Sequence, residues 1–170
     1  MLVAEELFAS GCQFLISVTS AGQLVEHLTP PYFVLIDRAL RDEGTSYHYM
    51  SAAAEYSVVN EKLLNTMSGV LLANHPPVVR GGTWTTDAPF RETAEGIAAM
   101  RARGLLAVEM EAAALYAFAS ARAKPVLCFA HVTNQMGRIE GDFEKGVADG
   151  SSDALELIWN SAQAWRSAQR

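Results

Sequence analysis

The sequence is poor in cysteine and in basic residues, and both shortages narrow what the protein can be. Its two cysteines, Cys12 and Cys128, cannot form a disulfide framework or a cysteine-based metal site, so we expect a reduced, cytoplasmic setting and no metal. Lys and Arg number 13 against 19 Asp and Glu, which gives a formal net charge of −6. Because an acidic chain without a basic run binds nucleic acid or an anionic membrane poorly, neither partner is expected.

Long hydrophobic runs are also missing, and the first residues do not predict a secretory signal. No apolar stretch reaches the roughly 18 residues of a membrane span. The opening residues, MLVAEE, lack the positive charge that begins a secretory signal, so a signal peptide is not expected. Half of the residues are nevertheless hydrophobic and 19% are charged, as in folded globular proteins. Since domains average about 150 residues, we expect residues 1–170 to form a single domain.

Short apolar segments alternate with helical patterns along the chain. The patterns predict strands at 12–18, 31–36, 78–85, 105–108 and 125–132, and a turn at 19–22. They predict helices at 2–10, 53–73, 91–103 and 109–123, and a last helix capped by Ser151 or Ser152. Strands that are apolar on both faces are usually covered by helices on both sides. The sequence therefore predicts an α/β fold, a three-layer α/β/α sandwich around a mixed, mostly parallel sheet.

Polar clusters follow five of these strands, at the end of the sheet where α/β folds bind their ligands. The clusters are Thr19–Ser20, Arg38 to Tyr49, Thr85 to Asp87, Glu109 to Glu111 and Thr133 to Gln135. Five clusters at five strand ends indicate a site for a small molecule.

Two of the clusters allow a structural as well as a functional interpretation. Glu109 and Glu111 flank Met110 at the start of a helix, where acidic residues commonly stabilise the helix dipole. Alternatively, a carboxylate there accepts hydrogen bonds from sugar hydroxyls, and Met110 forms an apolar wall. The segment RDEGTSYHY at 41–49 is either a turn that bonds its own backbone or a loop that gathers donors around Arg41 for an anion or a sugar.

Two further clusters are open in the same way. Asn134 carries both a donor and an acceptor and could bind the edge of a heteroaromatic base, or Thr133 and Asn134 could form an ordinary turn after a strand. Thr19 and Ser20, with the Ala-Gly that follows, could hold an oxyanion through hydroxyls and backbone N–H groups. That segment lacks the lysine of a Walker loop.

Together, these segments resemble the nucleoside phosphorylase superfamily, which includes uridine phosphorylases and hexameric purine nucleoside phosphorylases. VEMEAAALYAFA at 108–119 resembles its ribose-binding signature, and the segment at 41–49 resembles a loop of uridine-phosphorylase-like members. TTDAPFRET at 85–93 and HVTN at 131–134 fall, in the right order, where the family has its base-pocket segments. The similarity covers most of the chain.

The resemblance implies an activity and a set of residue roles. The family cleaves the N-glycosidic bond of a nucleoside with inorganic phosphate as co-substrate, giving a free base and ribose 1-phosphate without a metal or redox cofactor. The expected roles are ribose binding by Glu109, Met110 and Glu111, catalysis at the departing base by Asn134, base binding by Phe90 and Thr133, and phosphate binding by Ser20. Asn134 and the 41–49 loop favour a uridine-type substrate over a purine nucleoside.

The resemblance is weakest on the phosphate side. The family's chain usually begins well upstream of this Met1, with its first strands and a phosphate loop, so the chain is expected to be N-terminally short. Ser17 stands where the family has a phosphate Arg, and Thr19 stands where it has a Gly. Losing an Arg removes charge-assisted hydrogen bonds worth about 1.5–3 kcal/mol each. Arg41, Arg38 or a neighbouring subunit would then have to supply the charge.

Three hypotheses follow from this departure. The chain is a phosphorylase with a substitute cation, a phosphate-independent nucleosidase, or a nucleoside or base binder or inactive homologue without turnover. Because missing strands would expose sheet edges, which natural proteins cover, we also expect a homo-oligomer, a dimer or higher.

Overall fold

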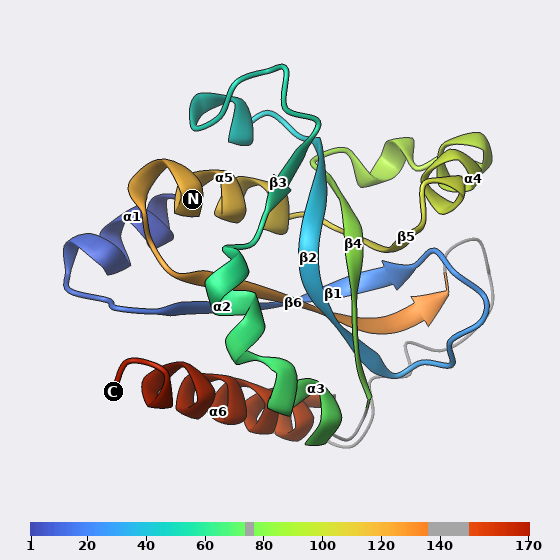
Figure 1. Cartoon of the computed structure of the whole chain (residues 1–170). Helices are drawn as coiled ribbons and strands as arrows, with labels where there is room; N and C mark the ends of the chain where they lie inside the picture. Colours follow the sequence, from blue (N-terminus) through green and yellow to red (C-terminus); the bar gives the residue numbers. More distant parts are fainter. Residues whose placement is uncertain (74–76, 136–149) are drawn as a thin grey trace.

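The computed structural model describes residues 1–73, 77–135 and 150–170 (Figure 1). Its strands are β1 (Leu15–Gln23), β2 (Tyr32–Asp42), β3 (Tyr56–Val58), β4 (Val78–Thr86), β5 (Leu105–Glu109) and β6 (Val126–Gln135). Its helices are α1 (Leu2–Ala9), α2 (Glu61–Thr66), α3 (Ser68–Ala73), α4 (Ala94–Ala102), α5 (Ala112–Arg122) and α6 (Ser151–Ser167), with short 3-10 turns η1 (Ser46–His48) and η2 (Pro89–Arg91). None of the helices in these residues could span a membrane.

The six strands form one mixed sheet in the order β3-β2-β4-β5-β1-β6. The longest pairings, β1–β6 and β2–β4, are parallel, and β4–β5 is parallel as well. An additional antiparallel pairing connects β6, the last strand in this order, to β2, the second, so that β2, β4, β5, β1 and β6 close into a ring and β3 stays outside it. The predicted α/β fold around a mixed sheet is confirmed, and the ring closure is a feature that the sequence pattern does not reveal.

The ring leaves little free strand edge. β3 has three residues and pairs with β2 alone. β1 pairs with β6 along its length but meets β5 only at Gly22 and Gln23. Within the described residues, the stretch of β1 from Leu15 to Ala21 therefore has a partner strand on one side only. Oligomer formation stays a prediction, and this stretch is the edge to which it applies.

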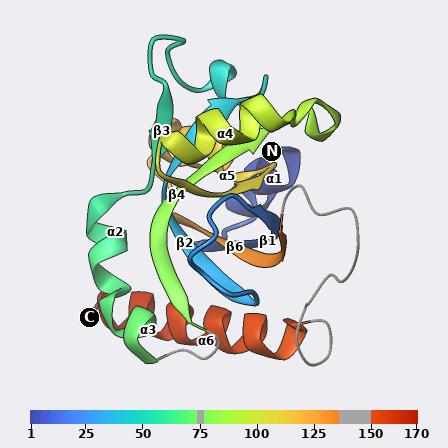
Figure 2. The same ribbon diagram turned by 90° about the vertical axis from the view of Figure 1, so that its right-hand side faces the viewer.

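Helices cover the ring from different sides. α5 packs against β2, β3 and β6, whereas α6 packs against α2 and α3. Figure 2 shows α6 and α3 along one end of the molecule, with α4 and α5 toward the other. The sequence of α5, AAALYAFASAR, suits its place, because its small alanines let the helix approach the strands closely and every side chain from Ala112 to Phe118 is buried.

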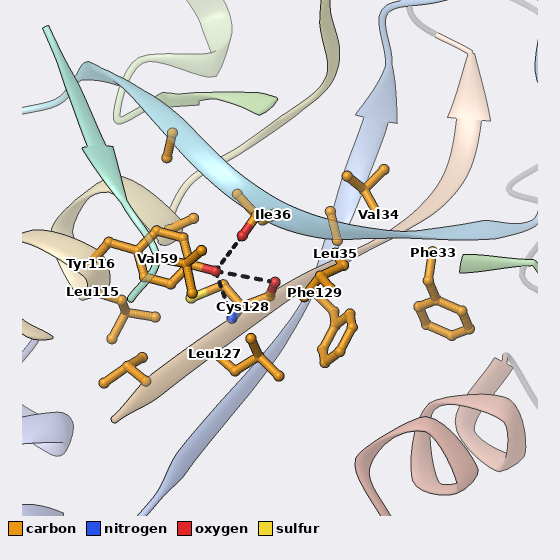
Figure 3. Close-up of a cluster of buried hydrophobic side chains, with 14 of the residues drawn as sticks. Phe33, Val34, Leu35, Ile36, Val59, Leu115, Tyr116, Leu127, Cys128 and Phe129 are labelled. Carbon is orange, nitrogen blue, oxygen red and sulfur yellow. Dashed lines mark hydrogen bonds between the residues drawn. The ribbon is translucent and has the colours of Figure 1, made fainter. Parts of the chain in front are cut away.

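A dense apolar core fills the space between α5 and the strands (Figure 3). Tyr116 carries the polar group at its centre, where the Tyr116 hydroxyl donates to the Ile36 carbonyl at 2.6 Å and accepts the Cys128 N–H at 3.0 Å. Because buried polar groups are costly unless hydrogen-bonded, these bonds let a tyrosine lie in the core and tie α5 to β2 and β6. Burial raises the pKa of the Tyr116 hydroxyl well above its usual value, so the hydroxyl stays protonated.

Two predicted elements are wrong. The predicted turn at 19–22 lies within β1, because the pairing of β1 with β6 continues through Gly22 opposite Asn134. The predicted helix at 53–73 is instead β3 followed by α2 and α3. Its first part pairs with β2, and the Asn60 side chain accepts the Leu63 N–H at 3.1 Å, so that the helix begins only after that residue. The strand predicted at 31–36 is also longer, and β2 takes Arg41 and Asp42 out of the predicted loop.

Candidate functional site

The junction between β5 and α5 forms the centre of the candidate site. Met110 and Glu111 connect the two elements, and both are exposed. β1 runs antiparallel beside β5, and the Thr19 hydroxyl on β1 donates to Glu111 Oε2 at 2.6 Å. The Met110 N–H also donates to this carboxylate oxygen, at 3.2 Å. Glu111 thus presents an oriented, solvent-accessible carboxylate, of the kind that can accept hydrogen bonds from the hydroxyls of a ligand.

Glu109 lies beneath this junction, and its carboxylate bonds to the protein itself. Its side chain is 2% exposed, and its Oε2 accepts the N–H groups of Glu111 and Ala112, each at 2.7 Å. Its Oε1 accepts the hydroxyls of Thr83, at 3.0 Å, and Thr85. Because both oxygens are already engaged, Glu109 has no free acceptor for the ribose contact predicted for it. It caps α5 and holds the turn that carries Glu111.

Two opposing effects act on the pKa of Glu109. Burial raises it, and the hydrogen bonds from Thr85, Ala112, Glu111 and Thr83 lower it, with a net increase. Thr85 extends the same network, since its hydroxyl also accepts the Ala113 N–H at 3.0 Å. The sequence pattern does not reveal this role of Thr83 and Thr85, although their spacing of two residues in a strand places both side chains on one face.

Arg41, predicted to bind phosphate, is enclosed by its own loop. Its side chain is buried, at 5% exposure, and its guanidinium lies 4.4 Å from the centre of the Tyr47 ring. The guanidinium donates from Nε to the Ser46 hydroxyl at 2.8 Å, and from Nη1 to the carbonyls of Ser51, at 2.7 Å, and Ala54. The geometry therefore matches the structural interpretation of segment 41–49, in which the loop satisfies its own polar groups.

We expect Arg41→Gln to lower the free energy of unfolding by about 2–4 kcal/mol, because it leaves buried loop carbonyls without their charged donor. Urea denaturation followed by circular dichroism measures the change. Arg80→Gln is the control, since Arg80 is an exposed cation paired with Asp37 and should change stability little. If Arg41→Gln left stability unchanged and weakened the binding of inorganic phosphate in calorimetry, Arg41 would be a ligand residue after all.

The remaining predicted site residues belong to three different elements, β1, η2 and β6. Ser20 follows Thr19 on β1 and is exposed. Phe90 lies on η2 and is 84% exposed, so its ring is not packed into a preformed base site. Thr133 and Asn134 belong to β6, not to a turn after it, and their side chains lie outside the described residues. The backbone of Asn134 pairs with Gly22, three residues beyond Thr19, which is roughly 10 Å along the strand.

Two other expectations concern cations. Arg38, the alternative phosphate cation, forms an ion pair with the neighbouring Asp37, with 3.4 Å between Arg38 Nη1 and Asp37 Oδ1. The Arg38 side chain is 41% exposed. Among the described residues, no three His, Cys, Asp or Glu side chains come close enough together to hold a metal ion.

The family model of the phosphorylase superfamily matches residues 1–164. The chain belongs to the phosphorylase superfamily. Among solved structures, an AMP nucleosidase from Bacteroides thetaiotaomicron VPI-5482 is 18% identical, with a TM-score of 0.79 over 98% of this chain and 69% of that one. A uridine phosphorylase from Vibrio fischeri ES114 is 23% identical, with a TM-score of 0.72 over 96% of this chain.

These two structures show that the fold is shared, at sequence identities too low to carry over a substrate. The chain spans 64% of the uridine phosphorylase, less than two thirds of its length. The two enzymes also differ in the reaction that their names denote, phosphorolysis for the uridine phosphorylase and hydrolysis for the AMP nucleosidase. The shared fold is therefore compatible with either phosphate or water as the acceptor of the sugar. The choice between them depends on the residues around Glu111.

Proposed function

We propose that the chain binds a nucleoside through its ribose and cleaves the N-glycosidic bond. The observation that carries the proposal is the exposed carboxylate of Glu111, oriented by the Thr19 hydroxyl at 2.6 Å. Hydroxyl pairs on a ribose are donors that suit such a carboxylate. Met110, 47% exposed beside it, offers an apolar surface to the sugar ring.

The chemistry that this arrangement would support depends on positioning. Cleavage of an N-glycosidic bond passes through an oxocarbenium-like state, in which positive charge grows on the sugar and electrons flow into the base. A site that fixes the ribose, and supplies a donor to the departing base, lowers the barrier by orientation and electrostatics. We assign the ribose to Glu111 and Met110 and the base to Asn134, with Thr133 and Phe90 as further base contacts and Ser20 on the acceptor side.

Phosphorolysis of a uridine-type nucleoside is the reaction that the sequence resemblance favours, with inorganic phosphate as co-substrate. One observation favours hydrolysis as a second candidate. Ser17 stands in place of the family's phosphate Arg, and the guanidinium of Arg41 is bound to loop carbonyls. Water needs no cation to hold it, so a nucleosidase tolerates this loss better than a phosphorylase does.

Chromatographic detection of free base, from a panel of purine and pyrimidine nucleosides with and without inorganic phosphate, separates these candidates. We expect base release from at least one nucleoside. Release only with phosphate identifies a phosphorylase, and release in both conditions identifies a nucleosidase. Binding without release identifies a nucleoside binder and refutes catalysis, and folded protein that neither binds nor cleaves any nucleoside refutes the proposal as a whole.

A further inference from the structure

A groove of about 640 Å³ lies on the molecule away from Glu111. It is formed by α2, the carboxyl-terminal ends of α5 and α6, and the amino-terminal end of β6. α2 and α6 lie side by side here (Figure 1). Glu111 precedes the first turn of α5, whereas Ala119 and Ser120, which line the groove, lie eight and nine residues further along, about 12–14 Å away at 1.5 Å per residue. The groove is therefore separate from the candidate nucleoside site.

The floor of the groove is apolar and its rim is polar. Val59, Leu63 and Val126 are at most 6% exposed and form the floor. Trp165 forms part of the wall and is held in place by stacking on Phe14, with 4.9 Å between the ring centres. A volume between about 300 and 1,000 Å³, mostly apolar with a few polar groups, is typical of sites for small molecules.

The charged side chains of the groove are both positive. Lys62 and Lys124 line it, and none of the described lining residues is acidic. Lys62 makes no ion pair with a described residue, and the Lys124 ammonium lies 5.4 Å from the centre of the Phe8 ring without a carboxylate partner among the described residues. On a chain with a net charge of −6, two such lysines beside one groove make a local attraction for an anion.

We propose that this groove binds a small organic monoanion, a carboxylate carried on an aromatic or branched apolar body. The apolar floor and Trp165 take the body, and the two lysines take the charge. The two longer helices that end here, α5 and α6, present their carbonyl ends. Because these ends carry partial negative charge, a single negative charge on the ligand suits the groove better than a multiply charged phosphate.

Indole N–H signals in nuclear magnetic resonance spectra test the proposal at the residue concerned. The chain has three tryptophans, of which Trp165 lines the groove and Trp84 donates its indole N–H to Asp42, away from it. Naphthalene-2-carboxylate serves as the probe, and Trp165→Phe assigns the signal. We expect a saturable shift of the Trp165 signal while the Trp84 signal stays in place.

The charge requirement is tested by the double variant Lys62→Gln/Lys124→Gln. Both lysines are exposed, so the fold should persist, and an unchanged Trp84 signal verifies this. We expect the dissociation constant to rise about tenfold in the double variant, because two modest charge contacts are lost, and to stay unchanged in Arg80→Gln. Neutral naphthalene-2-carboxamide should bind more weakly to the parent chain. Equal affinity for carboxylate and carboxamide, an unaltered constant in the double variant, or no saturable shift at Trp165 would overturn the proposal.

Discussion

Glu111→Gln should weaken nucleoside binding about tenfold to a hundredfold and leave the fold intact. Hydrogen bonds to a charged acceptor contribute about 1.5–3 kcal/mol, and the amide replaces one carboxylate oxygen with a donor that cannot accept from a ribose hydroxyl. Glu111 is exposed, so the loss of its charge should cost little stability. Calorimetric titration with the nucleoside that gives the strongest signal measures the change.

The matched comparison is between the nucleoside and its free base, which lacks the ribose. The free base should bind equally well to the parent chain and to Glu111→Gln, because the proposed contact involves only the sugar. Glu6→Gln, which removes an exposed carboxylate on α1, should leave nucleoside affinity as it is. If Glu111→Gln bound the nucleoside as tightly as the parent chain, the assignment of Glu111 to ribose would be wrong. An equal loss for free base and nucleoside would place Glu111 at the base instead.

The position of Thr19 beside Glu111 illustrates what the sequence could not reveal. The segment VEMEAA marks Glu111 by its neighbours along the chain, and this is local information. Thr19 lies 92 positions earlier, and it reaches Glu111 only because β1 runs antiparallel to β5. That register depends on how the whole ring closes, and no periodicity within either segment encodes it. Local pattern therefore identifies the chemical group, whereas tertiary pairing supplies the residue that orients it.

The errors in the predicted elements have the same origin. Small residues at 19–22 favour a turn by propensity, but β6 offers a complete row of backbone partners and draws them into a strand. At 53–73 the apolar residues follow helical spacing, yet the part before Asn60 pairs with β2. Tertiary pairing overrode local preference in both cases. The strand at 125–132 was predicted more successfully, because a nearly continuous apolar run has to be buried in any arrangement.

Of the two acidic residues that flank Met110, one fits the structural interpretation and the other fits the functional interpretation. Glu109 fits the structural one, an acidic side chain that binds the first N–H groups of a helix. Glu111 keeps its carboxylate exposed and carries the functional one as a proposal. The hydrophobic pattern alone cannot separate them, since the two are only two positions apart. Their burial separates them, because Glu109 is 2% exposed and accepts hydrogen bonds from Thr83 and Thr85 on the neighbouring β4, whereas Glu111 is exposed.

Glu109→Met should therefore destabilise the protein by about 3–5 kcal/mol, a large part of the total stability of an ordinary domain. Methionine has a similar length but no comparable acceptor, so two buried N–H groups and two threonine hydroxyls lose their partner. Urea unfolding measures this loss. Glu109→Gln is the matched control, and it should cost much less. Its amide oxygen can accept the two N–H groups, and its amide nitrogen can donate to threonine hydroxyls that rotate to receive it.

Nucleoside affinity in the same two variants distinguishes support from contact. If Glu109 supports the junction, Glu109→Gln keeps both stability and affinity. Glu109→Met then loses both, because the turn that carries Glu111 is no longer held. If Glu109 instead binds ribose directly, Glu109→Gln keeps stability but loses affinity. The amide would preserve the bonds to the backbone while removing the charge that a sugar hydroxyl would meet. Equal urea midpoints for Glu109→Met and the parent chain would show that the buried network contributes nothing, contrary to the geometry of β4, β5 and α5.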